Sequence, residues 1–167
     1  MQFKMNRRTM MATSAAARFA SGSTVLADGH ATMHEVQMLN QDPNEPRNRQ
    51  VFEPRIIVVK PGDTVKFLAT DPGHNSEYIP EMSPEGVEGW EGRIGEEVEF
   101  VAETPGFYGY KCTPHASVGM VGLVIVEGEG MMENFEAAQE VRQRGRARQV
   151  WDEIWEEVEG MEFNVES

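Results

Sequence analysis

The chain contains few residues of several types that other classes of protein require. Its 167 residues include a single cysteine, Cys112, which excludes an intrachain disulfide. No stretch approaches the roughly 20 apolar residues of a membrane-spanning helix, so we predict no membrane span. Basic residues are scarce: 15 lysines and arginines stand against 28 acidic residues, a net charge of −13. This balance argues against a nucleic-acid partner, because nucleic acids bind basic surfaces.

The first 27 residues differ from the rest of the chain. They contain four basic residues and no acidic residue, and a stretch of small residues follows the Arg7-Arg8 pair. We predict an export signal over residues 1–27, cleaved after Ala27, and hence a periplasmic protein. The arginine pair favours the twin-arginine route over general secretion. A disordered basic tail is the alternative. Without this segment, 11 basic residues remain against 28 acidic ones, a net charge of −17.

The middle of the chain reads as short strands separated by turn residues. Apolar and polar residues alternate, or β-branched residues cluster, over 34–39, 55–60, 64–68, 96–101, 106–110 and 121–126. Such a series predicts a mainly β protein, either a sandwich or a small barrel. The last of these segments is too apolar for a half-exposed strand, so we place it centrally in its sheet. Proline and glycine between Tyr78 and Gly95 predict a loop with one short helical turn.

After Gly130 the hydrophobic period changes to that of a helix. Apolar residues fall on one face over 135–141 and on another over 150–158, and Gly145 marks a break between them. We predict two α-helices packed on the sheets through Trp151 and Trp155, rather than a tryptophan binding platform. Four arginines lie between the two apolar stripes, at positions 142, 144, 146 and 148. We expect them to pair with nearby glutamates; contact with a lipid or a protein partner is the alternative.

The most informative motif surrounds the lone cysteine. His115 follows Cys112 by three residues, Met120 follows His115 by five, and His74 lies upstream in Gly73-His74-Asn75. Two imidazoles, a thiolate and a weak thioether are the ligands of a blue-copper electron-transfer site. Zinc is the alternative metal, but structural zinc sites prefer further thiolate or imidazole to a thioether. We therefore predict one copper ion held by His74, Cys112, His115 and Met120.

Each of these residues has an ordinary structural interpretation when taken alone, as a core thiol, a core methionine or a turn histidine. The complete set at this spacing favours the metal site. His30 and His34 have no partners at metal-binding spacing, and we expect His34 to be structural. We also expect Asn75 either to bond the Cys112 sulfur or to tie the two ligand-bearing loops together, with Thr113 as a candidate partner, because groups behind the ligands orient them.

Several segments together resemble the pseudoazurins, a family of small periplasmic blue-copper proteins of the cupredoxin class. The resemblance spans about residues 35–126 and more loosely the C-terminal helices. It rests on Val36-Gln37-Met38-Leu39-Asn40, Pro61-Gly62-Asp63-Thr64-Val65, Gly73-His74-Asn75, Lys111-Cys112-Thr113-Pro114-His115 and Gly119-Met120. It implies a cupredoxin-like Greek-key β-sandwich of about eight strands, with two C-terminal α-helices. We accordingly divide the chain into the signal (1–27), the copper-binding sandwich (28–130) and a helical extension (131–167).

The resemblance also implies a function. We predict that the chain is a monomeric electron carrier and not an enzyme. It passes electrons from a cytochrome-type donor to a periplasmic reductase, typically copper nitrite reductase. The alternatives are a copper-binding enzyme domain or subunit acting on nitrite or a related small molecule, a copper storage or delivery protein, or a plastocyanin-like or amicyanin-like carrier for another partner. Pro72 stands where pseudoazurins often have a lysine, so we expect weaker attraction to an acidic partner. Docking would then rely on an apolar rim around His115.

Overall fold

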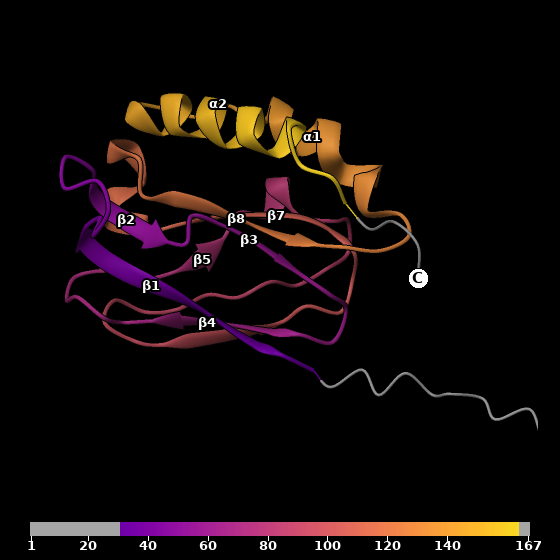
Figure 1. Ribbon diagram of the computed structural model, residues 1–167, viewed down its shortest axis with the longest axis horizontal. Helices are drawn as coiled ribbons and strands as arrows, with labels where there is room; N and C mark the ends of the chain where they lie inside the picture. The colour runs from indigo at the N-terminus through magenta and orange to yellow at the C-terminus, as the bar shows by residue number, and fades with distance from the viewer. Residues whose placement is uncertain (1–30, 164–167) are drawn as a thin grey trace, which may run out of the picture.

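Two four-stranded sheets packed face to face, with two helices over one of them, make up the computed structural model (Figure 1). The structure describes residues 31–163; the predicted export signal lies outside them. The strands are β1 (Met33–Gln41), β2 (Arg49–Glu53), β3 (Ile56–Val59), β4 (Thr64–Leu68), β5 (Glu77–Tyr78), β6 (Val98–Val101), β7 (Gly106–Lys111) and β8 (Val121–Val126). The helices are α1 (Phe135–Glu140) and α2 (Arg146–Glu159).

The strand order mixes parts of the chain that are distant in sequence. One sheet has the order β2-β1-β4-β6 and the other β3-β8-β7-β5. Strand β1 runs parallel to β4, and β3 runs parallel to β8, whereas the remaining neighbours are antiparallel. The predicted cupredoxin-like sandwich with two C-terminal helices is confirmed. All six strands predicted from the alternation are present, and β8 is an interior strand whose residues are all buried.

Two strands have no counterpart among the six segments that the sequence pattern marked. β2 has only one fully buried residue, Phe52, and β5 is two residues long. Both are edge strands, and each is held by pairing with a stronger neighbour, β1 or β7. Strands this short, or with this little burial, give almost no periodic signal.

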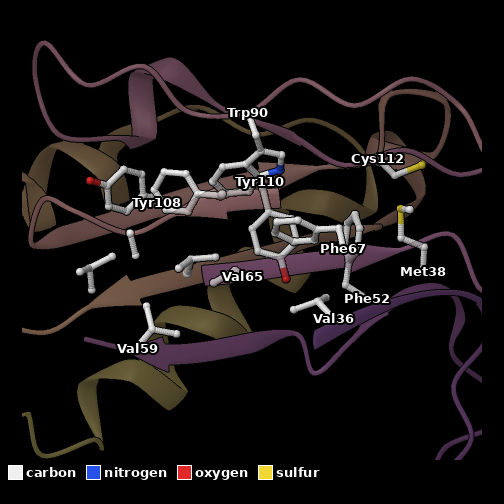
Figure 2. Packing of buried hydrophobic residues seen from close by; sticks show 14 of the residues in the cluster. Val36, Met38, Phe52, Val59, Val65, Phe67, Trp90, Tyr108, Tyr110 and Cys112 are labelled. Carbon is white, nitrogen blue, oxygen red and sulfur yellow. The ribbon is translucent and has the colours of Figure 1, made fainter. Parts of the chain in front are cut away.

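The sandwich interior is a cluster of aromatic rings between the sheets (Figure 2). Phe67 stacks on Trp90 with ring centroids 4.9 Å apart, and Tyr110 meets Phe67 edge-on at the same distance. Trp90 comes from the long segment between β5 and β6, where the predicted short helical turn is a 3-10 turn at Pro80–Met82. The Trp90 ring nitrogen donates to Ser76 Oγ at 2.8 Å. The long loop thus supplies a central core residue.

The helices cover the outer face of the β3-β8-β7-β5 sheet (Figure 1). Trp151 and Trp155 are both buried and stack on each other with centroids 5.4 Å apart, which confirms their packing role. Val150, Ile154 and Val158 complete the buried face of α2. The helix therefore rests on β8, the strand that begins directly after Met120.

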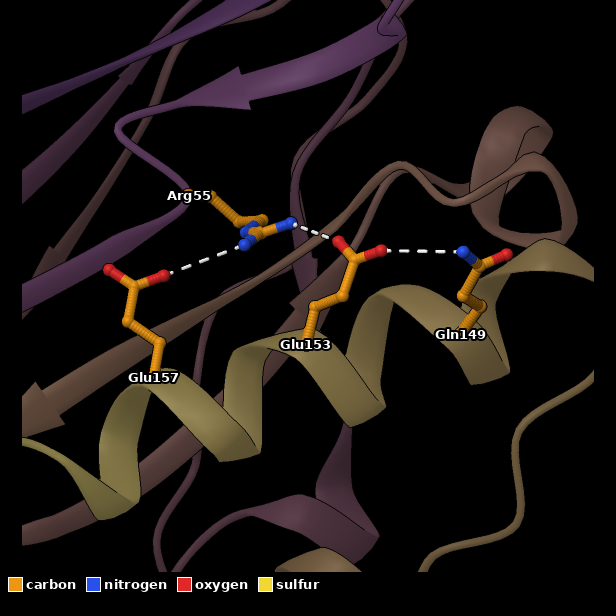
Figure 3. Close-up of polar contacts among 4 residues, drawn as sticks. All are labelled: Arg55, Gln149, Glu153 and Glu157. Carbon is orange, nitrogen blue, oxygen red and sulfur yellow. Dashed lines mark hydrogen bonds and ion pairs between the residues drawn. The ribbon is translucent and has the colours of Figure 1, made fainter.

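The expected pairing of the four arginines with glutamates was wrong. Among residues 31–163, none of the ion pairs involves Arg142, Arg144, Arg146 or Arg148. Two glutamates of α2, Glu153 and Glu157, contact Arg55 instead (Figure 3). Arg55 Nη1 lies 3.1 Å from Glu153 Oε2, and Arg55 Nη2 lies 3.5 Å from Glu157 Oε2. These contacts join α2 to the segment between β2 and β3.

His34 has the structural role expected of it. Its Nε2 lies 2.9 Å from Asp63 Oδ2, at the opposite end of β1 from Asn40. Burial opposes ionisation of Asp63, but hydrogen bonds from the Thr32 and Lys60 N–H groups and from His34 outweigh it and lower the Asp63 pKa. The carboxylate thus fixes the start of β1 against the turn before β4.

Candidate metal centre

Three of the four predicted ligands lie on one short connection between β7 and β8. Cys112 directly follows β7 and is still extended, and a 3-10 helix, Thr113–Val118, begins after it. Met120 donates its N–H to the His115 carbonyl at 3.1 Å, and its own carbonyl accepts from the Cys112 N–H at 3.0 Å. The connection therefore folds back so that the backbone of Met120 lies beside that of Cys112.

Glycine is required where this connection turns back. Gly119 has a φ of 102°, in the left-handed region that side chains disfavour. A Cβ at this position would also lie 2.9 Å from Val150 Cγ2 of α2. The connection and the helix thus pack against each other at Gly119.

His74 reaches the same place from the loop between β4 and β5. Its carbonyl accepts a hydrogen bond from the Gly95 N–H at 2.8 Å. Its ring Nε2 lies 3.0 Å from Asn40 Oδ1, at the end of β1, which leaves Nδ1 facing Cys112. Such a contact fixes the orientation and tautomer of a ligating imidazole. Nothing in the sequence around Asn40 indicates this role, because the contact joins residues 34 positions apart.

The three side chains converge on one point. His74 Nδ1 lies 3.1 Å from His115 Nδ1, and Cys112 Sγ lies 3.8 Å from the former and 3.5 Å from the latter. One candidate donor atom from each of the three residues lies within 4.8 Å of the other two. His74 and Cys112 are fully buried, whereas His115 is half-buried. Of the three side chains, only that of His115 is thus partly accessible to solvent.

Asn75 joins the two loops as predicted. Its Nδ2 donates to Thr113 Oγ1 at 2.9 Å, and its Oδ1 accepts from the Thr113 N–H at 2.8 Å. The same Nδ2 also donates to the Gly92 carbonyl at 3.0 Å. Because Asn75 is buried beside His74 and Thr113 follows Cys112, this clamp fixes the spacing between two predicted ligands.

Burial sets the protonation of the cluster. It raises the pKa of the Cys112 thiol, an effect that backbone N–H groups of Asn75 and His115 oppose. Burial also lowers the pKa of His74, and the neighbouring His115 lowers it further. His74 is therefore neutral near pH 7, the state in which an imidazole ligates a metal, while Cys112 must lose a proton on metal binding. Soft sulfur with two imidazoles fits copper in both oxidation states.

Met120 is fully buried directly after the turn, in the same core cluster as Cys112. A second methionine, Met38 of β1, belongs to that cluster and lies at the same end of the core as Cys112 (Figure 2). The assignment of Met120 as the fourth ligand stays a prediction, and Met38 provides its natural control.

Two apolar residues near the ligands in the chain are exposed to solvent. Val118, three residues after His115, is 45% exposed, and Ile94, which precedes the residue that donates to the His74 carbonyl, is 61% exposed. Two lysines, Lys111 before Cys112 and Lys66 of β4, form ion pairs with glutamates. Lys111 Nζ lies 3.0 Å from Glu77 Oε1, and Lys66 Nζ lies 2.9 Å from Glu97 Oε2.

Comparisons with known proteins agree with this geometry. Residues 40–127 match the family described as copper binding proteins, plastocyanin/azurin family. A pseudoazurin of Paracoccus pantotrophus is 42% identical over 83% of this chain and 92% of its own length. A pseudoazurin of Methylorubrum extorquens is 37% identical over 74% of this chain and 80% of its own. The solved structure of native pseudoazurin from Hyphomicrobium denitrificans superposes with a TM-score of 0.69 at 40% identity, covering 75% of this chain and 98% of that one.

The sandwich, the convergent donors and these relatives define a single class of protein. The chain belongs to the plastocyanin/azurin family of copper-binding proteins and, within it, to the pseudoazurins. It is an electron-transfer copper protein rather than an enzyme. No helix among the described residues is long and apolar enough to cross a membrane.

Proposed function

We propose that this chain carries single electrons in the periplasm, with one type 1 copper ion held by His74, Cys112, His115 and Met120. It would receive electrons from a cytochrome-type donor and deliver them to a reductase such as copper nitrite reductase. The observation that carries the proposal is the convergence of His74, Cys112 and His115 from two loops into a buried cluster with one accessible edge.

The role of the protein frame is to hold the donors still. When bound, copper supplies a one-electron couple, Cu(I)/Cu(II), that both soft sulfur and imidazole ligands accept. Asn40 fixes the His74 ring, and Asn75 fixes the distance between the loops. Because Asn40 and Asn75 are themselves anchored in the sandwich, the donor atoms keep nearly the same positions in both oxidation states. A small movement of the ligands between the two states favours fast electron exchange.

His115 is the proposed point of electron entry and exit. Its ring is the only one of the three clustered side chains that is not fully buried, and the exposed apolar residues Pro114 and Val118 lie on the same connection. An apolar rim lets a partner approach closely by excluding water, without a requirement for matched charges. We propose that the protein acts there as a monomer, with residues 1–27 as its export leader and 131–167 as a helical extension of the sandwich.

The delivery of electrons to a reductase has a direct test. We expect the reduced protein to lose its electron to oxidised copper nitrite reductase in a bimolecular step, followed by stopped-flow absorbance, with copper retained on each protein. The control is the same mixture without reductase but with nitrite. Nitrite turnover by the protein alone would indicate an enzyme. Transfer of copper to the acceptor without electron transfer would indicate a delivery protein.

The assignment of Met120 is tested against the second buried methionine. We expect Met120→Leu to keep the thiolate absorption but raise the reduction potential, because an axial thioether stabilises Cu(II) more than an alkyl group does. Met38→Leu, a matched change in the same core cluster, should leave the potential nearly unchanged. Voltammetry of the two variants decides the assignment: a larger shift in Met38→Leu would transfer the role to Met38.

A further inference from the structure

Asp71 joins the end of β1 to the loop that carries His74. Strands β1 and β4 run parallel up to the pair Gln37 and Leu68. In a parallel ladder, a residue donates its N–H to one residue of the neighbouring strand, and its carbonyl accepts from the residue two positions further along that strand. Asp71 keeps the first of these bonds, because its N–H donates to the Met38 carbonyl at 3.0 Å. The loop therefore stays attached to β1 beyond the end of β4.

The Asp71 side chain makes the second bond of this ladder in place of the backbone carbonyl. The Asn40 N–H donates to Asp71 Oδ2 at 2.7 Å. The backbone turns away at this point, because Pro72 has a restricted φ and no N–H, and Gly73 has a φ of 92°, in the left-handed region. The carboxylate thus pairs the Asn40 N–H while the chain turns toward His74.

Asn40 extends this contact to the His74 ring. Its Oδ1 lies 3.0 Å from His74 Nε2, the ring nitrogen that does not face Cys112. His74, Asn40 and Asp71 therefore form a series of two hydrogen bonds, which begins at a fully buried ring and ends at a half-buried carboxylate. Asn40 itself is exposed, so its orientation depends on hydrogen bonds rather than on packing in the core.

The Asp71 carboxylate also places a negative charge behind His74. The two hydrogen bonds and the span of the Asn40 residue keep the carboxylate within roughly 11 Å of the His74 ring. Burial lowers the pKa of His74 and the neighbouring His115 lowers it further, whereas the Asp71 carboxylate opposes both effects. In the described part of the chain, no lysine or arginine forms an ion pair with Asp71. No salt bridge therefore neutralises the charge that acts on His74.

We propose that Asp71 is a positioning residue of the copper site, which orients the His74 ring through Asn40, and that its negative charge lowers the reduction potential. This inference rests on the proposed function. A negative charge behind the ring stabilises Cu(II) more than Cu(I), because the oxidised ion carries the greater positive charge. One carboxylate thus contributes both a hydrogen-bond acceptor and a charge, and substitutions separate the two contributions.

The contribution of the charge is measured with Asp71→Asn, which keeps an oxygen able to accept the Asn40 N–H. We expect a higher reduction potential in the copper-loaded variant. The equilibrium constant for reduction should rise roughly two- to fivefold, the effect of one solvent-screened charge at about 11 Å. Voltammetry at low ionic strength measures this shift, and added salt should diminish it.

Asp63→Asn is the matched control for the loss of charge. Asp63 also accepts backbone N–H groups, from Thr32 and Lys60, but at the opposite end of β1. Its replacement should leave the reduction potential nearly unchanged. An unchanged or lower potential in Asp71→Asn, or an equal rise in Asp63→Asn, would overturn the proposal.

The positioning of His74 is tested without copper. NMR spectra of the metal-free protein report the Nε2–H proton of His74 and the exchange of the Asn40 amide with solvent. We expect Asp71→Asn to resemble the wild type in both. Asp71→Ala should broaden the Nε2–H signal and speed exchange of the Asn40 amide roughly fivefold, the loss of about one hydrogen bond.

Circular dichroism of each variant provides the control for folding, and Asp71→Asn decides the effect of the charge even if Asp71→Ala does not fold. A folded Asp71→Ala variant with the wild-type His74 and Asn40 signals would contradict the positioning role. If these signals respond as expected but the protein does not exchange electrons through copper, only the proposed function fails. Reversible copper electrochemistry without any response to the Asp71 variants would overturn this inference and leave the proposed function standing.

Discussion

Replacing Cys112 by serine is expected to abolish the visible absorption of the copper-loaded protein and its ability to exchange electrons. The thiolate is the one strongly electron-donating ligand in the cluster, and its charge-transfer band with Cu(II) gives such sites their colour. A serine hydroxyl does not ionise near neutral pH and is a hard donor, so it does not replace the soft sulfur that stabilises Cu(I). Cys112 also lies 3.5–3.8 Å from both imidazoles, so the loss falls at the centre of the cluster.

The substitution should leave the fold intact, because serine differs from cysteine only by a smaller oxygen atom in place of the sulfur. Circular dichroism and a urea midpoint of the metal-free protein provide this control. Retention of an intense visible band in Cys112→Ser would show that the sulfur is not a ligand. Unfolding of the metal-free variant would instead assign Cys112 a structural role.

Replacing Trp151 by alanine is expected to lower the free energy of unfolding by about 3–5 kcal/mol, the range for large aromatic core residues. The side chain is 2% exposed and joins α2 to the β3-β8-β7-β5 sheet. Urea denaturation followed by circular dichroism measures the change. Because α2 packs on the copper-binding connection at Gly119, we also expect amide signals from residues 113–119 to broaden in this variant.

Trp151→Phe separates packing from hydrogen bonding. The ring nitrogen of Trp151 is buried without a hydrogen-bond partner, the one such side-chain atom in the described residues. Phenylalanine keeps most of the apolar contact and removes the unpaired donor, so the loss should be well below that of alanine. Equal losses in the two variants would mean that the indole itself, and not general packing, holds the helix.

The parts of the molecule that sequence analysis predicted are those with local signals. The Cys112, His115 and Met120 spacing lies within nine residues, and the connection that carries them folds largely through its own backbone hydrogen bonds. The six predicted strands each have a period of two or a β-branched run. The stripes of α2 and the Gly145 break have a clear helical period, and the structure places both as expected.

The parts that sequence analysis missed depend on contacts between distant segments. Asn40 acquires its role only because β1 ends beside His74. Trp90 belongs to a loop without periodicity, yet fills the core of the sandwich. Arg55, rather than the four arginines at 142–148, contacts Glu153 and Glu157 of α2, because the segment between β2 and β3 runs past that helix. Charge pairing over such distances leaves no local pattern.

Pro72, in the place where pseudoazurins often have a lysine, led to the expectation of weaker attraction to an acidic partner. Lys111 does precede Cys112, but its Nζ lies 3.0 Å from Glu77 Oε1, so the positive charge next to this ligand is paired.

The most direct test of the central claim is voltammetry of the protein after addition of one equivalent of Cu(II). The proposed site predicts a reversible one-electron wave at one copper per chain, accompanied by the visible thiolate band, and no metal loss over repeated cycles. An irreversible wave, release of copper on reduction, or a protein that binds zinc and stays colourless with copper would contradict the assignment of this chain as an electron carrier.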